Sequence, residues 1–186
     1  MLAFGRSLAS EADLALDWRL ASAEETGLGA GEFDVVTACQ CWHWFDGPAA
    51  ANETRRVLSP DGRVVVCGFD WLPLPQSVAG LTEELIEAYN PAWDLGGVRD
   101  PAPSVETDLA SVGMRVSERF VWDLEIVYRS ESWYRRIEAS AGILSLTSKE
   151  AGAFGRELIE VLTESFGSGD LKVPHRVWGL ISAPVG

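Results

Sequence analysis

The sequence FDVVTA at residues 33–38 is a short apolar run rich in β-branched residues, a pattern typical of a buried parallel strand. DGP at residues 46–48 follows and predicts the start of a helix, because proline suits the first helical turn. The triplet VVV at residues 64–66 centres a second strand over residues 63–69. A strand, a helix and a strand at this spacing form a βαβ unit, which implies an α/β fold with helices packed on a parallel sheet.

The residues around this unit predict further elements of the same fold. Helical spacing predicts a helix over residues 2–9, and alternation of apolar and polar residues predicts a strand over Leu14–Leu20. The glycines of Glu25–Glu32 indicate a loop before the first strand of the unit. Ser59–Gly62 predicts a turn, with proline in its second position and glycine in its fourth.

The second half predicts helices and antiparallel strands around an irregular crossing. Apolar residues at helical spacing predict a helix near Leu81–Tyr89, with Glu83 and other acidic residues on its opposite side. Three prolines and a glycine pair indicate an irregular segment over Asn90–Ser104. The remaining expected elements are a short helix ending near Gly113, a strand over Met114–Val127, a helix from Ser130, a long helix opened by the capping box of Thr147 and Glu150, and a closing strand over Lys172–Ser182 in which His175 is an exposed edge residue.

The composition is that of a globular protein, with 47% apolar and 23% charged residues over 186 positions. This length suits one domain with a sizeable core. The net charge is −13 and no basic stripe occurs, so we expect neither nucleic acid nor an anionic membrane as a partner. No window approaches ~18 uninterrupted apolar residues. The odd count of three cysteines fits a reducing, cytoplasmic setting.

A series of motifs fills residues 18–66: Trp18, AEETGL at 23–28, FDVV at 33–36, QCWHWF at 40–45, Glu53 and RVLSPDG at 56–62. In order and spacing they resemble the class I S-adenosylmethionine-dependent methyltransferases of the methyltransferase type 11 group. The resemblance implies a Rossmann-like sheet, N-terminally truncated, with antiparallel C-terminal strands and helical cover. Residues 1–186 are then a single methyltransferase-like domain, in which 1–70 form the remaining Rossmann-like half and 71–186 form a lid and the C-terminal strands and helices.

The family's cofactor loop has no counterpart in this sequence. In the family a glycine-rich turn after the first strand and a carboxylate after the second hold S-adenosylmethionine. The matched region begins after both, and Gly5 lies in a helical pattern. The resemblance therefore implies S-adenosylmethionine as a cofactor conditional on a missing N-terminal part, with weak or no binding by residues 1–186. A start at an internal methionine would explain this arrangement.

Three residues take a cofactor role from the resemblance. Ala23 and Glu24 match the loop that meets the adenine, with a plain surface charge as the alternative for Glu24. Gln40 follows the strand at the edge where open α/β sheets bind ligands.

His43 is the candidate catalytic residue, because a histidine has a pKa near neutrality and serves as a general base. The alternative is a hydrogen-bonded histidine within an aromatic lining. The candidate substrate-binding residues are Trp42, Trp44, Tyr89 and Trp93. For Tyr89 and Trp93, ordinary packing under a long loop is the competing interpretation.

The sequence predicts no metal site. Cys39, Cys41 and His43 alternate and would face one way in an extended segment, but structural zinc takes four ligands in other spacings. Cys67 is expected as a buried strand residue. Glu53 and Arg56 are expected to form a surface ion pair.

Two classes of function follow from these observations. The first is a methyltransferase acting on a small molecule, with the acceptor atom left open. The alternative is a non-methylating binding or assembly protein, completed by a partner chain. A homo-oligomer would form through an exposed sheet edge near Val35 and Val65.

Overall fold

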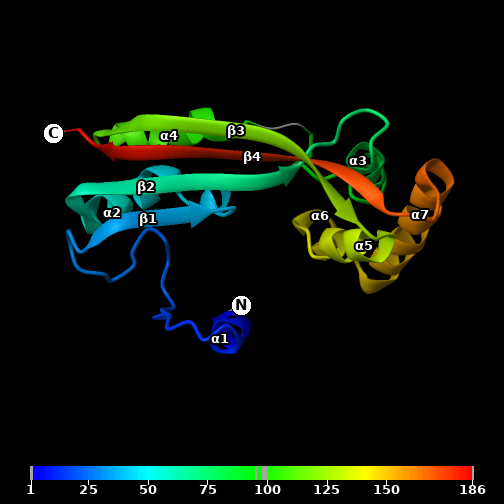
Figure 1. The fold of residues 1–186 in the computed structure, drawn as a ribbon, viewed down its shortest axis with the longest axis horizontal. Helices are drawn as coiled ribbons and strands as arrows, with labels where there is room; N and C mark the ends of the chain where they lie inside the picture. The colour runs from blue at the N-terminus through cyan, green and yellow to red at the C-terminus, as the bar shows by residue number, and fades with distance from the viewer. Residues whose placement is uncertain (1, 95, 98–99, 186) are drawn as a thin grey trace.

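The computed structural model describes residues 2–94, 96–97 and 100–185, and it contains a four-stranded mixed sheet (Figure 1). The strand order is β1-β2-β4-β3. Strand β1 (Phe33–Cys39) runs parallel to β2 (Leu58–Trp71), and β4 (Leu171–Pro184) lies antiparallel between β2 and β3 (Met114–Tyr128). The predicted α/β class, the parallel first half and the antiparallel closing strands are confirmed.

The βαβ unit forms as predicted, with one difference in its second connection. Helix α2 (Gly47–Val57) begins after Asp46, whose Oδ1 accepts a hydrogen bond from the Ala49 amide at 3.1 Å. The expected turn at 59–62 is instead a bulge inside β2, because pairing with β1 already begins at Leu58. Leu58 pairs with Phe33 and Arg63 with Val35, so four residues of β2 lie opposite a single residue of β1.

Two hydrophobic clusters hold the fold together. The first lies between the sheet and the helices α2 and α4 (Ala102–Ser111), around residues such as Val64, Leu109 and Leu180. The second lies among α3 (Val78–Tyr89), α5 (Ser130–Glu138), α6 (Ala141–Leu144) and α7 (Ser148–Phe166), around Trp133 and Phe154. Figure 1 shows β3 and β4 extending from the first cluster into the second.

The capping box that opens α7 is confirmed. The Thr147 hydroxyl accepts from the Glu150 amide at 3.3 Å, and the Glu150 carboxylate accepts from the Thr147 amide at 2.9 Å. The helix ends at Gly167, whose φ of 79° is easy for glycine. Across the described residues, no helix combines the length and the apolar character that crossing a membrane requires.

The N-terminal segment confirms one prediction and contradicts another. Helix α1 (Leu2–Glu11) forms as expected, and in Figure 1 it lies apart from the sheet. The predicted strand over Leu14–Leu20 is wrong, because an extended segment becomes a strand only when a neighbour accepts its hydrogen bonds. Among the described residues no strand pairs with it, and Leu20 is 91% exposed.

Candidate functional site

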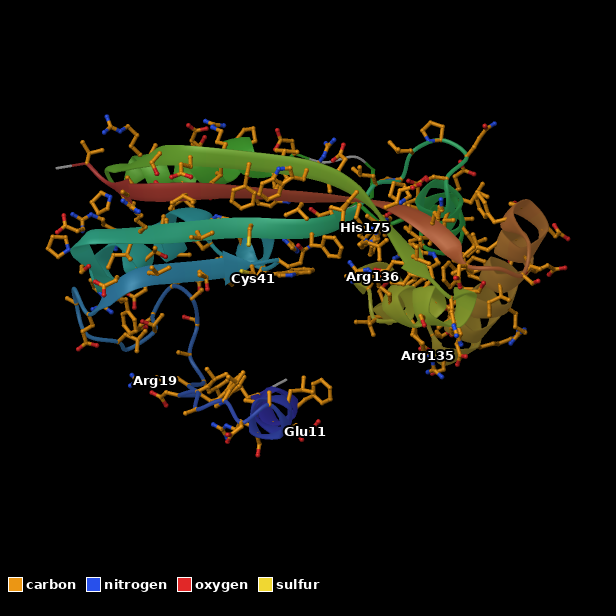
Figure 2. The ribbon with its side chains drawn as sticks, viewed as in Figure 1. Glu11, Arg19, Cys41, Arg135, Arg136 and His175 are labelled. Carbon is orange, nitrogen blue, oxygen red and sulfur yellow. The ribbon has the colours of Figure 1, made fainter. Side chains whose placement is uncertain are left out.

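A cavity of about 680 Å³ opens at the carboxyl ends of β1 and β2, between the sheet and the helical cluster. Open α/β sheets bind ligands at this end of their strands. In Figure 2, Cys41 marks the sheet side and Arg136 the helical side, and both residues line the cavity. Its wall contains many aromatic residues, which are Trp42, Trp44, Phe69, Trp71, Trp93, Tyr128 and Trp178.

The chain changes direction at Gln40, directly after β1, and the Gln40 side chain forms hydrogen bonds to β2. Its φ of 57° is uncommon for a residue other than glycine. Its side-chain oxygen accepts from the Phe69 amide at 2.6 Å, and its side-chain nitrogen donates to Asp70 Oδ1 at 2.5 Å. The segment around Cys39 and His43 is therefore not extended, and its alternating residues do not face one way. Among the described residues, no group of three or more His, Cys, Asp or Glu side chains could hold a metal ion.

Two carboxylates lie in the cavity wall, and each is held by neutral N–H donors. Asp70 Oδ2 accepts from Trp178 Nε1 at 2.8 Å. Glu83 accepts from Trp71 Nε1 at 2.6 Å and from Trp93 Nε1 at 2.9 Å. The expectation that Glu83 lies on a polar helix face is wrong, since it is 5% exposed and the two indoles satisfy its oxygens.

His43 and Trp44 are exposed at the rim of this cavity, with their ring centroids 4.7 Å apart. Trp42 is buried, and its Nε1 donates to Asp108 Oδ2 at 3.0 Å. Trp93 lines the cavity next to Glu83. The structure thus brings together Gln40, Trp42, His43, Trp44 and Trp93.

Three other predicted site residues lie outside the cavity wall. Ala23 packs against the first hydrophobic cluster, and Glu24 accepts a hydrogen bond from the Asp46 amide at 3.0 Å. Tyr89 donates its hydroxyl proton to Glu157 at 2.6 Å, and this hydrogen bond raises the pKa of the tyrosine. Its ring packs edge-on against Phe154 in the second cluster.

The loop that contains Ala23 and Glu24 is anchored by a buried acid. Glu53 accepts from the Thr26 amide at 2.9 Å and from Arg56 Nε at 2.7 Å, while Arg56 also donates to the Leu28 carbonyl at 2.7 Å. These bonds, above all those from Arg56, lower the pKa of Glu53 to about 2. The expected surface ion pair is therefore a half-buried loop anchor, because the loop covers Glu53.

Cys39 and Cys67 lie opposite each other on β1 and β2, with their sulfur atoms 3.3 Å apart. Both are free thiols. Burial raises the pKa of Cys67 to about 11, with the Cys39 hydrogen bond as a second cause. Burial also raises the pKa of Cys41. At neutral pH Cys41 and Cys67 are thus protonated, weakly nucleophilic thiols.

Sequence reasoning missed two residues next to this site. His175 is 0% exposed, stacked on Phe69 with centroids 4.6 Å apart, and burial lowers its pKa, so the expectation of an exposed edge residue is wrong. The strand period of two places it on the face of the apolar Leu171 and Val173, and this signal could have identified it. The guanidinium of Arg136 lies 5.6 Å from the ring centroids of both Phe69 and Trp71.

Comparison with known sequences finds similarity to methyltransferases in the first third of the chain. The sequence profile of a family described as “Methyltransferase domain” matches residues 1–66. A candidate methyltransferase from Dictyostelium discoideum is 32% identical over 54 residues, which are 29% of this chain and 20% of that protein. An uncharacterized methyltransferase from Mycobacterium tuberculosis is 44% identical over 45 residues, 24% of this chain and 18% of that protein. The matched stretch spans about a fifth of the length of these curated relatives.

Comparison with solved structures extends the likeness to nearly the whole chain. A candidate type II methyltransferase from Anaeromyxobacter dehalogenans superposes with a TM-score of 0.63 and 18% identity, over 94% of this chain and 76% of that one. The [4+2]-cyclase SpnF superposes with a TM-score of 0.51 and 17% identity, over 100% of this chain and 63% of that one. At these identities the likeness concerns the fold alone, which is Rossmann-like.

Proposed function

We propose that the chain serves S-adenosylmethionine-dependent methyl transfer to a small molecule at the cavity, because residues 1–66 match the profile of a family described as “Methyltransferase domain”. The observation that carries the proposal is the position of this aromatic cavity, at the carboxyl ends of two parallel strands within the matched fold. Its volume falls within the ~300–1,000 Å³ of small-molecule sites.

The cavity wall fits one end of the cofactor. When bound, S-adenosylmethionine supplies an electrophilic methyl group on a sulfonium cation. Aromatic faces and carboxylates stabilise such a cation, and the wall offers Trp178 beside Asp70. Gln40 holds the Asp70 carboxylate in place through its side-chain amide.

The described residues offer fewer candidate contacts to the nucleoside end of the cofactor. Ala23 and Glu24 lie outside the cavity wall, and the Glu24 carboxylate already accepts from Asp46. Further residues beside the outer edge of β1 would be needed to complete this half of the site. We therefore expect residues 1–186 to bind S-adenosylmethionine weakly.

The chain's own residues orient the acceptor and move a proton. Trp42, Trp44 and Trp93 hold an apolar acceptor and exclude water from the reacting centre. His43, at the rim, takes the proton released by a hydroxyl or amine acceptor. Orientation supplies most of the rate for an in-line displacement of this kind.

The test measures S-adenosylhomocysteine formation from millimolar S-adenosylmethionine with a panel of small-molecule acceptors. We expect His43→Gln to lower turnover by roughly 10²-fold or more. Arg135→Gln is the control, since this exposed arginine pairs only with Glu131 and Glu138 among the described residues. Calorimetry adds an independent readout, and micromolar affinity for the cofactor would contradict the expected weak binding.

A second candidate is a non-methylating protein that binds a small molecule or assembles with a partner. The outer edge of β1 is unpaired among the described residues, and Val35 is 56% exposed. Val65 does not belong to this edge, because it lies in the inner strand β2. The likeness to a cyclase is a reminder that the fold does not fix the reaction.

Light scattering tests the assembly version of this candidate. Pairing through β1 predicts a dimer that Val35→Lys converts to a monomer, because a charge at an edge strand opposes pairing. A monodisperse monomer of the unchanged chain would contradict it.

A further inference from the structure

Arg136 is a cationic residue of the cavity wall that lacks an anionic partner in the described part of the chain. Within that part, its Nε is buried and has no hydrogen-bond partner, and its Nη2 reaches only the Phe69 carbonyl, at 3.5 Å. Among the described residues no carboxylate lies within ion-pair distance of it. The two cavity carboxylates, Asp70 and Glu83, are held instead by Gln40 and by indole N–H groups.

A second buried donor lies in the same wall. The hydroxyl of Ser140, directly after α5 and before α6, is buried and has no partner in the described part of the chain. Buried polar groups without partners are rare in folded proteins, so two of them in one cavity wall need an explanation. Both atoms are closed to the cavity as the wall stands, so ligand atoms that accept hydrogen bonds would satisfy them after side-chain rotations that turn the donors toward the cavity.

We infer that Arg136 and Ser140 bind the carboxylate of an organic acid, and that the acceptor is a small acid with an apolar or aromatic body; the role of acceptor rests on the proposed function. A planar carboxylate matches the fork of N–H groups on a guanidinium. Phe69 and Trp71 hold the flat guanidinium from their ring faces, so it lies in the cavity wall before the ligand arrives. The aromatic wall takes the rest of the molecule.

The charges of the wall favour a carboxylate over a phosphate. Asp70 and Glu83 lie in the same wall as Arg136, while Arg176 is neutralised by two hydrogen bonds to Asp123 at 2.7 Å. A phosphate monoester carries close to two negative charges at neutral pH. It would meet stronger repulsion from these carboxylates than a singly charged acid.

The experiment titrates the full chain with phenylacetate, phenylacetamide and benzyl phosphate, without S-adenosylmethionine. Binding is followed by NMR through the indole N–H signals of Trp71 and Trp93. We expect phenylacetate to shift these signals and to bind roughly tenfold or more tightly than its neutral amide, as charge-assisted hydrogen bonds imply. Arg136→Gln should abolish the preference, and Arg136→Lys should keep part of it.

Arg135→Gln is the matched control, because it removes the same charge one residue away, where the side chain is 68% exposed (Figure 2). It should leave the preference for the acid unchanged. Equal binding of acid and amide by the unchanged chain would overturn the inference, even if Arg136→Gln fails to fold. Tighter binding of benzyl phosphate, unshifted indole signals or a preference that survives in a folded Arg136→Gln would overturn it as well. A bound acid that is never methylated would count only against the proposed function.

Discussion

The two hydrophobic clusters are built on different principles. The cluster under the sheet consists largely of aliphatic residues such as Val64, Val66 and Leu109, which come from the sheet and from the helices α2 and α4. The helical cluster contains large aromatic residues, and polar groups are buried in and beside it. In it the Trp133 indole donates to the Thr82 hydroxyl at 3.0 Å, and His175 packs against that indole.

This difference shows which features of the sequence specify each of the two clusters. Aliphatic strands and a capped helix are specified by short patterns, whereas buried polar groups need partners supplied by distant segments. The cavity lies between the two clusters and takes its wall from both. The binding chemistry is accordingly divided between a half whose strands and first helix follow short sequence patterns and a half whose buried polar groups depend on partners from distant segments.

The largest expected effect is the loss of the central indole of the helical cluster. Trp133→Ala should lower the free energy of unfolding by about 3–5 kcal/mol, because it opens a cavity and removes the hydrogen bond to Thr82. Leu109→Ala, at an equally buried position of the sheet cluster, should cost about 2–4 kcal/mol. Urea denaturation measures both. A single transition in both variants would show one cooperative unit, and two transitions would separate the clusters.

The next effect concerns the anchor of the loop on the sheet side. Glu53→Gln should lower stability at pH 7 by about 1–3 kcal/mol, because it weakens the bonds to Thr26 and Arg56. The folded-state pKa of Glu53, about 2, lies below its ordinary value of 4.5, so its contribution is present above pH 4.5 and lost as the pH falls toward 2. The variant should therefore lose less stability over this range. Glu84→Gln, at an exposed position, makes the same charge change and should behave like the unchanged chain.

His175 should make the helical side sensitive to mild acid. Burial lowers its pKa below the ordinary 6.5. Just below pH 6.5, His175 is therefore protonated in the unfolded chain but still neutral in the folded chain. Stability should fall with decreasing pH in this window, by at most about 1.4 kcal/mol per pH unit. His175→Phe should remove this slope, and His43→Gln, which keeps the buried ring, should retain it. If the dependence of stability on pH persists in His175→Phe, another titratable group causes it.

The smallest effects should be alike in both regions. Asp46→Ala removes the cap of α2 on the sheet side, and Thr147→Ala removes that of α7 in the helical cluster. Each substitution should lower the free energy of unfolding by about 1 kcal/mol, while Asp46→Asn and Thr147→Ser should lower it by less. Thermal unfolding followed by circular dichroism measures all four. A much larger cost at one cap would show that it also positions its cluster.

The sequence predicted those parts of the fold whose cause is local. FDVVTA, the DGP helix start and the Thr147 capping box each act within a few residues, and all three form as expected. The strand prediction for Leu14–Leu20 was wrong because a strand pattern has no effect without a neighbouring strand. The predicted exposure of Glu83 and His175 was wrong because their burial depends on aromatic residues from other elements.

The candidate site was predicted in part for the same reason. Gln40 to Trp44 follow a strand directly, so their place at the carboxyl edge could be read from the sequence. Arg136 could not be found in this way, because its neighbour Arg135 has the same chemistry. Only the packing of α5 against Phe69 and Trp71 separates the half-buried Arg136 from the exposed Arg135.

The antiparallel pairing of β3 and β4 has a mechanical consequence. Its ladder is long and continues from the pair Met114–Pro184 beside the sheet cluster to the pair Tyr128–Leu171 in the helical cluster. The two halves are thus joined by one ribbon as well as by loops. Beyond the pair Trp71–His175 the strand β2 no longer accompanies it, and two-stranded ribbons twist more than wider sheets. We therefore expect the mouth of the cavity to open and close by a change in ribbon twist, with α5 following the strands, rather than by a hinge in a single loop.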